Sequence, residues 1–475
     1  MALLDKKALF RKKITSHEDY IDSGLRKCLS AFDLTLLGIG CIIGTGIFVL
    51  TGIAAATQAG PAVVLSYVAA GIACGCAALA YAELAASVGG CGSAYGYSYA
   101  AFGELFAWII GWDLILEYGF ATAAVANGWA GYFSDFLTAF GWGLPESLTH
   151  APKHGGIVNL PAAGIVLLLM ALLVAGVKQS ASANAVLVYV KLATVALFII
   201  FAVGHVDAAN WSPFMPYGWY EELADGKKVG VFAAASLVFF AYIGFDAVST
   251  AAEEAANPRR DLPIGILASL GICTVLYIVV SAIMTGIVPY TTLNVSSPAS
   301  HALLLVGATT AATIVSFGVI IGLISVMLVL YYGLTRVIFA MSRDGLISKF
   351  FSAISPRTQT PARVIVICGV IMAIIAGVIP LGELAELVNI GTLAAFVLVC
   401  IGVIVLRVLH PDMPRPFRTP FSPAIPVLGA VSCFYLIYTL PFVTWMRFLV
   451  WLGIGIVIYF GYSIRSSKLA SETVA

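Results

Sequence analysis

The sequence predicts an all-α polytopic membrane protein, and three observations lead to that fold class. Of its 475 residues, 61% are hydrophobic and only 10% are charged, whereas a soluble domain carries about 25% charged residues. Apolar runs of roughly 20 residues, the length of a membrane-spanning helix, recur from Leu36 to Ile464. Two of these runs are interrupted by glycine. A transmembrane barrel would instead show alternating segments of about ten residues.

The apolar runs give twelve candidate transmembrane helices. They are centred near residues 44, 74, 114, 167, 194, 242, 275, 326, 370, 395, 431 and 454. The eighth is expected to be long, because its apolar periodicity continues to Ala340. Residues 16–30 are compatible with an interfacial helix or with a solvated tail. The first run follows a polar segment and does not end at a small-residue cleavage site, so we expect no cleaved signal peptide.

The basic residues predict the orientation of the helices. With the N-terminus inside, the cytoplasmic segments hold 20 of the 25 Lys and Arg residues, the outer segments hold four, and Lys191 lies within a span. Cytoplasmic loops of membrane proteins carry such an excess of positive charge. We therefore expect a multi-pass protein of the cell membrane with both termini in the cytoplasm.

The first candidate helix has glycines in its middle, within Gly40–Phe48. Glycine costs about 1 kcal/mol relative to alanine inside a helix. Irregular backbone is tolerated at membrane depth only where it is buried in protein or lines a cavity, because lipid offers no hydrogen-bond partners. We predict two half-helices that meet at a pocket. The alternative is that these glycines provide close contact between helices.

The sixth candidate helix is interrupted in a similar way, by Gly244 and Asp246 near its midpoint. It begins a second set of five helices, and interrupted spans at matching places in two halves point to a transporter site. Because five is an odd number, the two sets would be inverted repeats. The predicted division is an N-terminal cytoplasmic segment at 1–30, the first repeat at 31–204, an outer loop at 205–228, the second repeat at 229–410, helices eleven and twelve at 411–464 and a cytoplasmic tail at 465–475.

Two interrupted helices that face each other suit a zwitterion. The N-terminal end of a half-helix offers N–H groups and partial positive charge to a carboxylate, while a C-terminal end offers carbonyls to an ammonium group. Thr45 and Gly46 would present N–H groups and a hydroxyl to the carboxylate. The carbonyls of Ile42, Phe240 and Ile243 would face the ammonium group.

Four ionisable residues lie within the predicted spans. A lysine at bilayer depth costs roughly 2.5–3.5 kcal/mol or more, so Lys191 is expected to face the helix bundle and to be functional. Glu117 follows Asp113 by one turn on the same helix face, and Asp246 follows the second interruption. We expect Glu117 and Asp246 to take part in proton movement. The alternatives are a carboxyl satisfied by hydroxyls for Glu117 and a helix cap for Asp246.

Three further acids lie near the predicted cytoplasmic helix ends. These are Glu83, Glu104 and Asp344. We expect them to form interface or gate pairs with Arg336 or Arg343 rather than to contact a substrate.

Six segments of the chain, in this order, resemble motifs of the amino acid–polyamine–organocation superfamily, most closely its cationic amino acid transporter branch. The segments are Gly40–Phe48, Gly89–Tyr97, Gly111–Tyr118, Tyr242–Asp246, Glu253–Arg260 and Met341–Leu346. The resemblance covers nearly the whole chain. It implies the leucine-transporter fold, in which five plus five helices form an inverted repeat with discontinuous helices 1 and 6, and here two extra helices follow.

The resemblance also implies roles for site residues. The substrate carboxylate would bind at Thr45 and Gly46, and Phe240 would stand as an aromatic gate over the substrate. Some proton-coupled members place a lysine where sodium-coupled relatives hold Na⁺, so Lys191 is predicted to carry the coupled proton; the alternative is a permanent structural cation. The predicted substrate-binding residues are Ile42, Ile43, Thr45, Gly46, Phe240, Ala241, Ile243 and Met327.

The predicted side-chain pocket favours neutral substrates. Ala121, Ala241, Met327 and Thr392 offer no carboxylate to a guanidinium group, although Glu117 would if it points that way. We expect proton-coupled symport of small to medium neutral L-amino acids by alternating access. An uncoupled exchanger and a cationic amino acid transporter are the alternatives, and a channel or a membrane-embedded enzyme is a distant one.

The expected partners are an L-amino acid, protons and membrane lipid, and a small accessory membrane protein is left open. We expect no nucleic acid, cofactor, metal site or catalytic residue. The six histidines fall in predicted loops or tails, no CxxC pair occurs, and the sequence has no Walker A motif. These absences argue against an intramembrane haem or zinc site and against ATP as the energy source.

Overall fold

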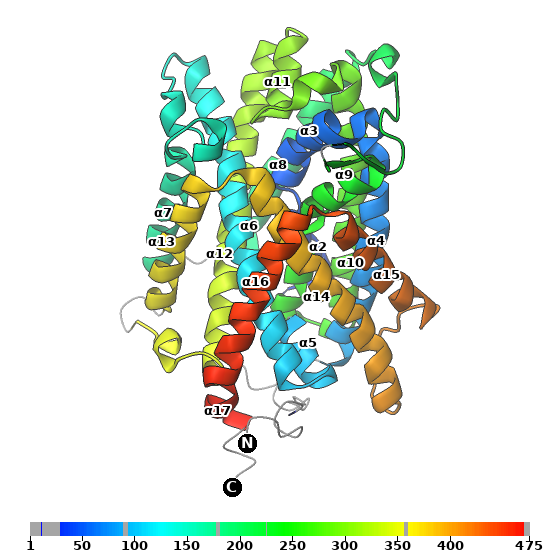
Figure 1. Ribbon diagram of the computed structural model, residues 1–475, viewed down its shortest axis with the longest axis vertical. Coiled ribbons are helices and arrows are strands. Elements are labelled where there is room, and N and C mark those ends of the chain that lie inside the picture. Colours follow the sequence, from blue (N-terminus) through cyan, green and yellow to red (C-terminus); the bar gives the residue numbers. More distant parts are fainter. Residues whose placement is uncertain are drawn as a thin grey trace.

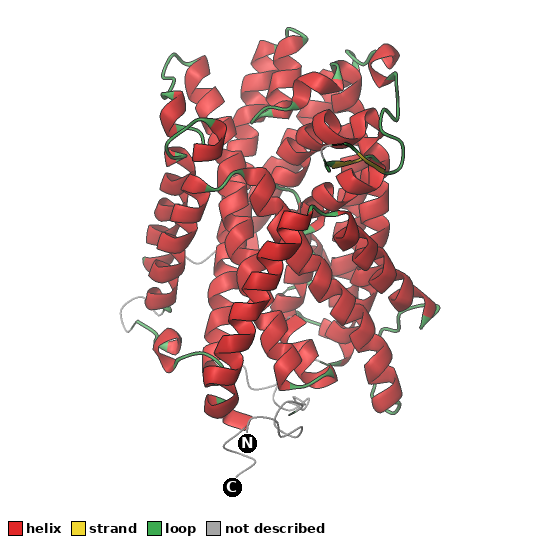
Figure 2. Ribbon diagram, in the orientation of Figure 1, coloured by secondary structure: helices red, strands yellow, loops and turns green. Residues whose placement is uncertain are grey.

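The computed structural model is almost entirely helical (Figure 2). It describes residue 11 and residues 29–88, 94–176, 181–224, 226–355 and 360–469. The segment 16–28, most of the predicted interfacial helix, lies outside the described residues, as do residues 89–93 of one family-like motif.

Within the described residues, the α-helices differ widely in length. They are α2 (Ala31–Ile42), α3 (Thr51–Ala54), α4 (Val63–Ser87), α5 (Ala94–Ala101), α6 (Glu104–Ala139), α7 (Leu160–Val174), α8 (Ala181–Val203), α9 (Val231–Val238), α10 (Pro258–Ile287), α11 (Pro298–Leu305), α12 (Thr309–Arg343), α13 (Ala362–Val378), α14 (Leu381–Leu409), α15 (Ala424–Thr439), α16 (Phe442–Ile458) and α17 (Ile464–Ser466). Two short strands, β1 (Glu221–Glu222) and β2 (Lys228–Val229), pair antiparallel.

Tighter and wider helical turns connect these helices. The 3₁₀ segments are Gly60–Ala62, Glu146–Leu148, Pro152–His154, Ala208–Trp211, Phe239–Tyr242, Asp246–Glu254, Tyr290–Leu293 and Lys349–Ser352. The π-helical segments are Gly46–Leu50, Ala55–Ala59 and Tyr459–Ser463. Wide turns of this kind occur mostly as short pieces, frequently at functional sites.

Eight helical stretches of the described chain are long and apolar enough to cross a membrane, and four shorter apolar helices accompany them. Every predicted centre lies in an apolar helix or at an interruption of one. The prediction of a long eighth helix is confirmed by α12, which continues to Arg343. The chain is therefore a polytopic helical membrane protein.

The long helices run along the vertical axis of Figure 1, with α6 and α12 packed together through the middle of the molecule. In an 18-residue apolar window of the interrupted stretch Val231–Ser249, 94% of the residues are buried, compared with 22% in such a window of Phe442–Ser466. The second interruption therefore lies at the centre of the bundle and α16 lies at its periphery. Figure 1 places α5 and α17 at one end of the molecule and α11 at the opposite end.

The start of α2 shows how local sequence fixes a helix end. The Asp33 N–H donates to the Ser30 hydroxyl (3.3 Å), and the Ser30 N–H donates to the Asp33 carboxylate (2.9 Å). This reciprocal pair satisfies backbone donors that have no partner within the helix. The helix that leads to the first interruption is thus anchored at its N-terminus.

The buried Glu83 does not pair with Arg336 or Arg343, so that prediction is wrong. Its carboxylate accepts two hydrogen bonds from Arg407 on α14, at 2.8 and 2.7 Å, and one from the Thr419 N–H at 2.7 Å. The contact joins the end of α4 to the end of α14 and the loop that follows it.

Glu104 also has other partners than predicted. Its carboxylate accepts hydrogen bonds from Ser467 at 2.5 Å and Tyr459 at 3.3 Å, and Arg11 lies 3.9 Å away. The Asp344 carboxylate accepts one from Tyr95 at 2.9 Å. The three acids do link helix ends, but their positions along the sequence do not show which helix ends are adjacent in space.

Candidate functional site

The first interruption separates α2 from the π-helical segment Gly46–Leu50. Helix α2 ends at Ile42, and Ile43 takes an extended conformation with ψ 102°. Helical dihedral angles return at Thr45. Only Ile43 and Gly44 are therefore unwound, and both are buried within the protein.

The second interruption is longer. Helix α9 ends at Val238 and continues as the 3₁₀ segment Phe239–Tyr242. Ile243 is extended with ψ 135°, and Gly244 has φ +112°, a conformation that residues with a Cβ rarely adopt. The 3₁₀ segment Asp246–Glu254 then follows. Both interruptions lie where the glycines of the sequence predict them.

The two interruptions lie directly against each other. A Cβ placed on Gly46 would collide with Cα and Cβ of Ala241. A Cβ placed on Gly244 would lie 2.8 Å from the Cβ of Cys41. These glycines thus let two irregular backbones approach more closely than any side chain would allow. The close contact between helices, expected as the alternative role of these glycines, is thus present, and a pocket at this crossing stays a prediction.

Side chains from neighbouring helices bond to carbonyls near the interruptions. The Lys191 Nζ on α8 donates to the Gly40 carbonyl at 2.5 Å. The Tyr277 hydroxyl on α10 lies 2.8 Å from the Ile42 carbonyl and 2.7 Å from the Ala241 carbonyl. These carbonyls belong to the last turns before each interruption, where the regular helical partner is missing.

The carbonyls at the C-terminal end of α9 accept hydrogen bonds from a side chain on α14. Asn389 Nδ2 donates to the carbonyls of Ser236 (2.7 Å) and Leu237 (3.1 Å). On the other side of the turn, the Gly244 N–H donates to Asp246 Oδ1 at 3.2 Å. Asp246 therefore makes the local contact expected of a cap, and it also accepts from the Tyr118 hydroxyl at 3.2 Å.

Lys191 is enclosed by protein. It is only 1% exposed, and its methylene chain packs against Gly322 of α12, where an added Cβ would lie 2.9 Å from Lys191 Cγ. Among the described residues, no carboxylate lies within salt-bridge distance of its ammonium group. The ammonium group donates its hydrogen bond to Gly40 in the C-terminal turn of α2, where the helix dipole is negative.

Thr45 presents a hydroxyl that has no hydrogen-bond partner among the described residues. The side chain is fully buried, and its methyl group packs on Gly128 of α6. A buried polar atom without a partner is costly, so the surroundings of this hydroxyl leave one hydrogen bond unmade. Phe240, Ile243 and Met327 are also buried, at 6%, 5% and 0% exposure.

A group of polar side chains lies between α6 and α14. Asp113 and Glu117 are 3% and 1% exposed, and Glu117 lies within electrostatic reach of Asp113 and Asp246. Asp113 Oδ1 packs against Gly391. Two buried oxygens of the group, Asp113 Oδ1 and Asn389 Oδ1, have no partner in the described residues, and the Thr392 hydroxyl lies beside the Glu117 carboxyl.

Sequence reasoning did not single out Tyr277, Asn389 or Tyr118 as site residues. Each is a hydrogen-bonding residue inside an apolar span, and such a residue can be recognised from the sequence as a candidate site residue. Their targets are carbonyls and a carboxylate on other helices, and the sequence does not reveal which helices become neighbours. In the described part of the chain, no group of His, Cys, Asp and Glu residues could hold a metal ion.

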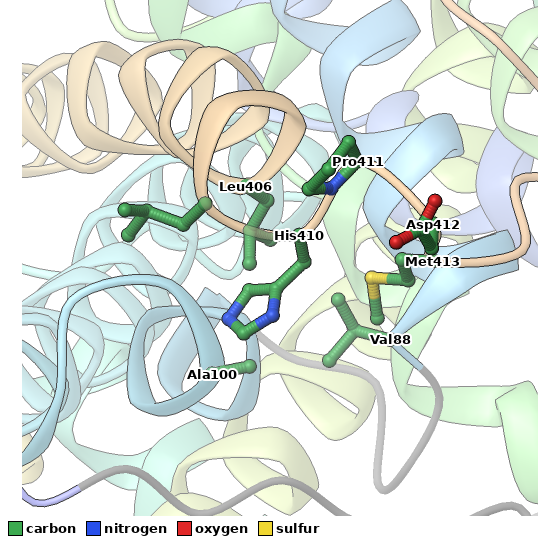
Figure 3. A pocket seen from close by; sticks show the side chains of 8 residues that line it. Val88, Ala100, Leu406, His410, Pro411, Asp412 and Met413 are labelled. Atoms are coloured by element: carbon green, nitrogen blue, oxygen red, sulfur yellow. The ribbon is translucent and has the colours of Figure 1, made fainter.

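A separate cavity of about 270 Å³ lies where α14 ends (Figure 3). Its lining residues are Val88, Ala100, Leu406, Leu409, His410, Pro411, Asp412 and Met413. Figure 3 shows the His410 ring facing Ala100 of α5. None of the residues at the two interruptions lines this cavity, so it is distinct from the candidate site.

The fold and the site define a polytopic helical membrane protein with two interrupted helices crossing at its centre. Residues 29–461 match the family model described as amino acid permease, and the chain belongs to this family. The family resemblance seen in the sequence is thereby confirmed. Members of a permease family are transporters, so the chain is not an enzyme.

Three relatives illustrate the similarity. The methylthioribose transporter of Bacillus subtilis (strain 168) is 50% identical over 466 residues, covering 97% of this chain and 99% of that protein. The branched-chain amino acid permease BcaP of the same organism is 51% identical over 474 residues, covering 98% and 99%. The vacuolar cationic amino acid transporter 4 of Arabidopsis thaliana is 38% identical over 392 residues, covering 82% and 64%.

Proposed function

We propose that the protein is a secondary active transporter that couples proton movement to uptake of small to medium neutral L-amino acids by alternating access. The observation that carries this proposal is the buried Lys191 ammonium, which bonds to the Gly40 carbonyl two residues before Ile42. A cation placed at this helix end can communicate a change in its protonation to the interruption.

The proposed substrate site uses the two interruptions. The substrate carboxylate binds at the free Thr45 hydroxyl and at the backbone of Gly46, near the N-terminus of the half-helix. The substrate ammonium group binds at the carbonyls of Ile42, Phe240 and Ile243. Burial of both interruptions supports this assignment, because a dry site strengthens each of these polar contacts.

The substrate side chain is proposed to lie among apolar groups. Ala241 and Met327 offer no charge, and Phe240 closes over the substrate as an aromatic gate. The name of the relative BcaP refers to branched-chain amino acids, which such a pocket would accommodate. The other Bacillus relative is named for methylthioribose, so this neutral thioether sugar belongs in any substrate panel.

The proposed coupling centres on Lys191. When the ammonium group loses its proton, its attraction to the negative end of α2 is lost, and Ile43 and Gly44 are free to rearrange. Glu117 and Asp246 are proposed to exchange protons with each other. Their carboxyl groups are buried and lie within electrostatic reach of one another, so one proton shared between them would relieve the repulsion of two buried charges.

The proposed topology has twelve membrane helices in the cell membrane and both termini in the cytoplasm. Helices one to five and six to ten form the inverted repeats, each beginning with an interrupted helix. The matching position of the two interruptions, one in each half of the chain, supports this arrangement.

Transport by purified protein in liposomes tests the proposal. We expect alanine, valine and leucine to accumulate under an inward proton gradient without Na⁺, and lysine and arginine to accumulate poorly. Lys191→Ala should abolish concentrative uptake, whereas the exposed Lys153→Ala should not. Concentration of substrate by Lys191→Ala in response to a pH gradient would overturn the coupling mechanism. Counterflow of wild-type protein with no effect of pH would favour an uncoupled exchanger.

A further inference from the structure

We propose that Tyr277 is a positioning residue that ties the two interrupted helices to each other and so sets the geometry of the substrate site. This inference rests on the proposed function for its effect on transport. Its structural basis is independent of that function. Tyr277 lies on α10, is fully buried, and belongs to neither interruption.

One hydroxyl group serves both interruptions. Tyr277 Oη lies 2.8 Å from the Ile42 carbonyl at the end of α2 and 2.7 Å from the Ala241 carbonyl before the second interruption. A phenol has a single proton to donate. Because both carbonyl oxygens lie within hydrogen-bond distance of that one proton, a three-centre bond joins both carbonyls to the same hydroxyl.

Neither carbonyl has its regular helical partner. The residue after Ile42 is extended, so the chain does not continue the helix that would supply a donor. The Gly244 N–H, which would close the next 3₁₀ turn onto Ala241, donates to Asp246 instead. Buried carbonyls left without donors are unfavourable, and the Tyr277 hydroxyl supplies the missing bond.

The Tyr277 ring is held rigidly by two other tyrosines. Its centroid lies 5.3 Å from that of Tyr67 on α4 and 5.4 Å from that of Tyr242 in the second interruption. The Tyr67 hydroxyl donates to the Gly46 carbonyl at 3.1 Å, and the Tyr242 hydroxyl donates to the Tyr67 carbonyl at 2.8 Å. The three tyrosines connect α4, α10 and both interruptions.

This arrangement bears on substrate binding because Ile42 and Ala241 are neighbours of the atoms proposed to bind the substrate. Ile42 supplies one of the proposed ammonium-binding carbonyls, and Ala241 precedes Tyr242 and Ile243 in the second interruption. A carbonyl oxygen has two lone pairs, so the Ile42 carbonyl can accept from Tyr277 and from the substrate together. Loss of the Tyr277 hydroxyl would remove the hydrogen bonds that join the Ile42 and Ala241 carbonyls, and only packing contacts and the Tyr67 and Tyr242 bonds would then set the spacing of the two halves of the site.

The substitution Tyr277→Phe tests this inference because it removes the hydroxyl and retains the ring. We expect the apparent KM for L-alanine to rise about tenfold, which corresponds to about 1.4 kcal/mol, while the maximal rate changes less than threefold. The matched control is Tyr331→Phe. Tyr331 is equally buried, and its hydroxyl donates to the Ile365 carbonyl at 2.5 Å, joining α12 to α13 away from both interruptions.

Hydrogen–deuterium exchange of the full-length protein in lipid nanodiscs gives a second readout that needs no transport. Tyr277→Phe should speed exchange at least threefold in peptides covering both 40–48 and 239–246, whereas Tyr331→Phe should leave both segments unchanged. Faster exchange in only one segment, or in neither, overturns the inference, as does an unchanged KM. If the wild-type protein transports no amino acid, the proposed function fails, and the exchange result still decides whether Tyr277 ties the interruptions together.

Discussion

At the scale of the residue, Thr45 offers the most direct test of the carboxylate site. Its hydroxyl is buried and unpartnered among the described residues, while its methyl group packs on Gly128. Thr45→Val keeps that packing and removes the hydroxyl. A hydrogen bond to a charged group contributes about 1.5–3 kcal/mol, so we expect the apparent KM for L-alanine in liposome uptake to rise at least tenfold.

Thr45→Ser is the matched control, because it restores a hydroxyl and removes only the methyl group. Its KM should lie within about threefold of the wild-type value. The role of the hydroxyl would be refuted by a valine variant with normal affinity. It would also be refuted by a serine variant as weak as the valine variant, since the methyl contact would then explain both defects.

At the scale of the element, the crossing of the two interruptions depends on Gly46. An added Cβ would meet backbone atoms of Ala241, including its nitrogen at 2.9 Å, and backbone cannot move aside as a flexible side chain can. We expect Gly46→Ala to destabilise the protein by roughly 1–3 kcal/mol through overpacking. Uptake should fall more than tenfold, because the two halves of the site are forced apart.

Gly271→Ala is the control for this prediction. Gly271 lies inside α10, and an added Cβ there would meet no atom within 4 Å, so the higher helix propensity of alanine should leave stability equal or slightly improved. Thermal unfolding in detergent and uptake in liposomes compare the two variants. Equal melting temperatures and equal uptake would show that the close contact at Gly46 is not needed.

The interruptions were predictable from the sequence because their cause is local. Glycine at Gly44, Gly46 and Gly244 weakens a helix wherever it lies, and an apolar span makes the anomaly visible. The hydrogen-bond and ion-pair partners on other helices were not predictable in the same way. The sequence could not show that Glu83 meets Arg407, or that Tyr277 reaches two carbonyls, because these contacts depend on which helices pack together.

Hydropathy located the helices themselves for a similar reason. Each span carries enough apolar surface to be recognised alone, and α12 could even be assigned its unusual length. The prediction of the site named backbone groups of the interruptions and several side chains, Lys191 among them, but not Tyr277 or Asn389. The side-chain network of the site depends on α10 and α14, whose contributions come from single polar residues without any repeating pattern.

At the scale of the whole molecule, the contacts at one end agree with the predicted sidedness. Ser467, beyond α17, donates to Glu104 at the start of α6, and the Lys468 N–H donates to the Asp344 carbonyl after α12. All of these residues lie in segments predicted to be cytoplasmic, and α11, predicted to lie outside, is at the opposite end in Figure 1. The loops of the molecule therefore separate into two sets, one at the end that holds α17 and one at the end that holds α11.

Labelling from one side of the membrane tests which set is cytoplasmic. Trp142 follows α6 on the predicted outer side and is 73% exposed, and Phe421 precedes α15 on the predicted inner side and is 84% exposed. In intact cells, a membrane-impermeant maleimide should label Trp142→Cys, and should label Phe421→Cys only after permeabilisation. The seven native cysteines that the structure describes are buried or partly buried, and wild-type protein treated alongside measures their background. The reverse pattern would invert the proposed orientation, because 20 of 25 basic residues would then face outward, against the charge asymmetry of membrane insertion.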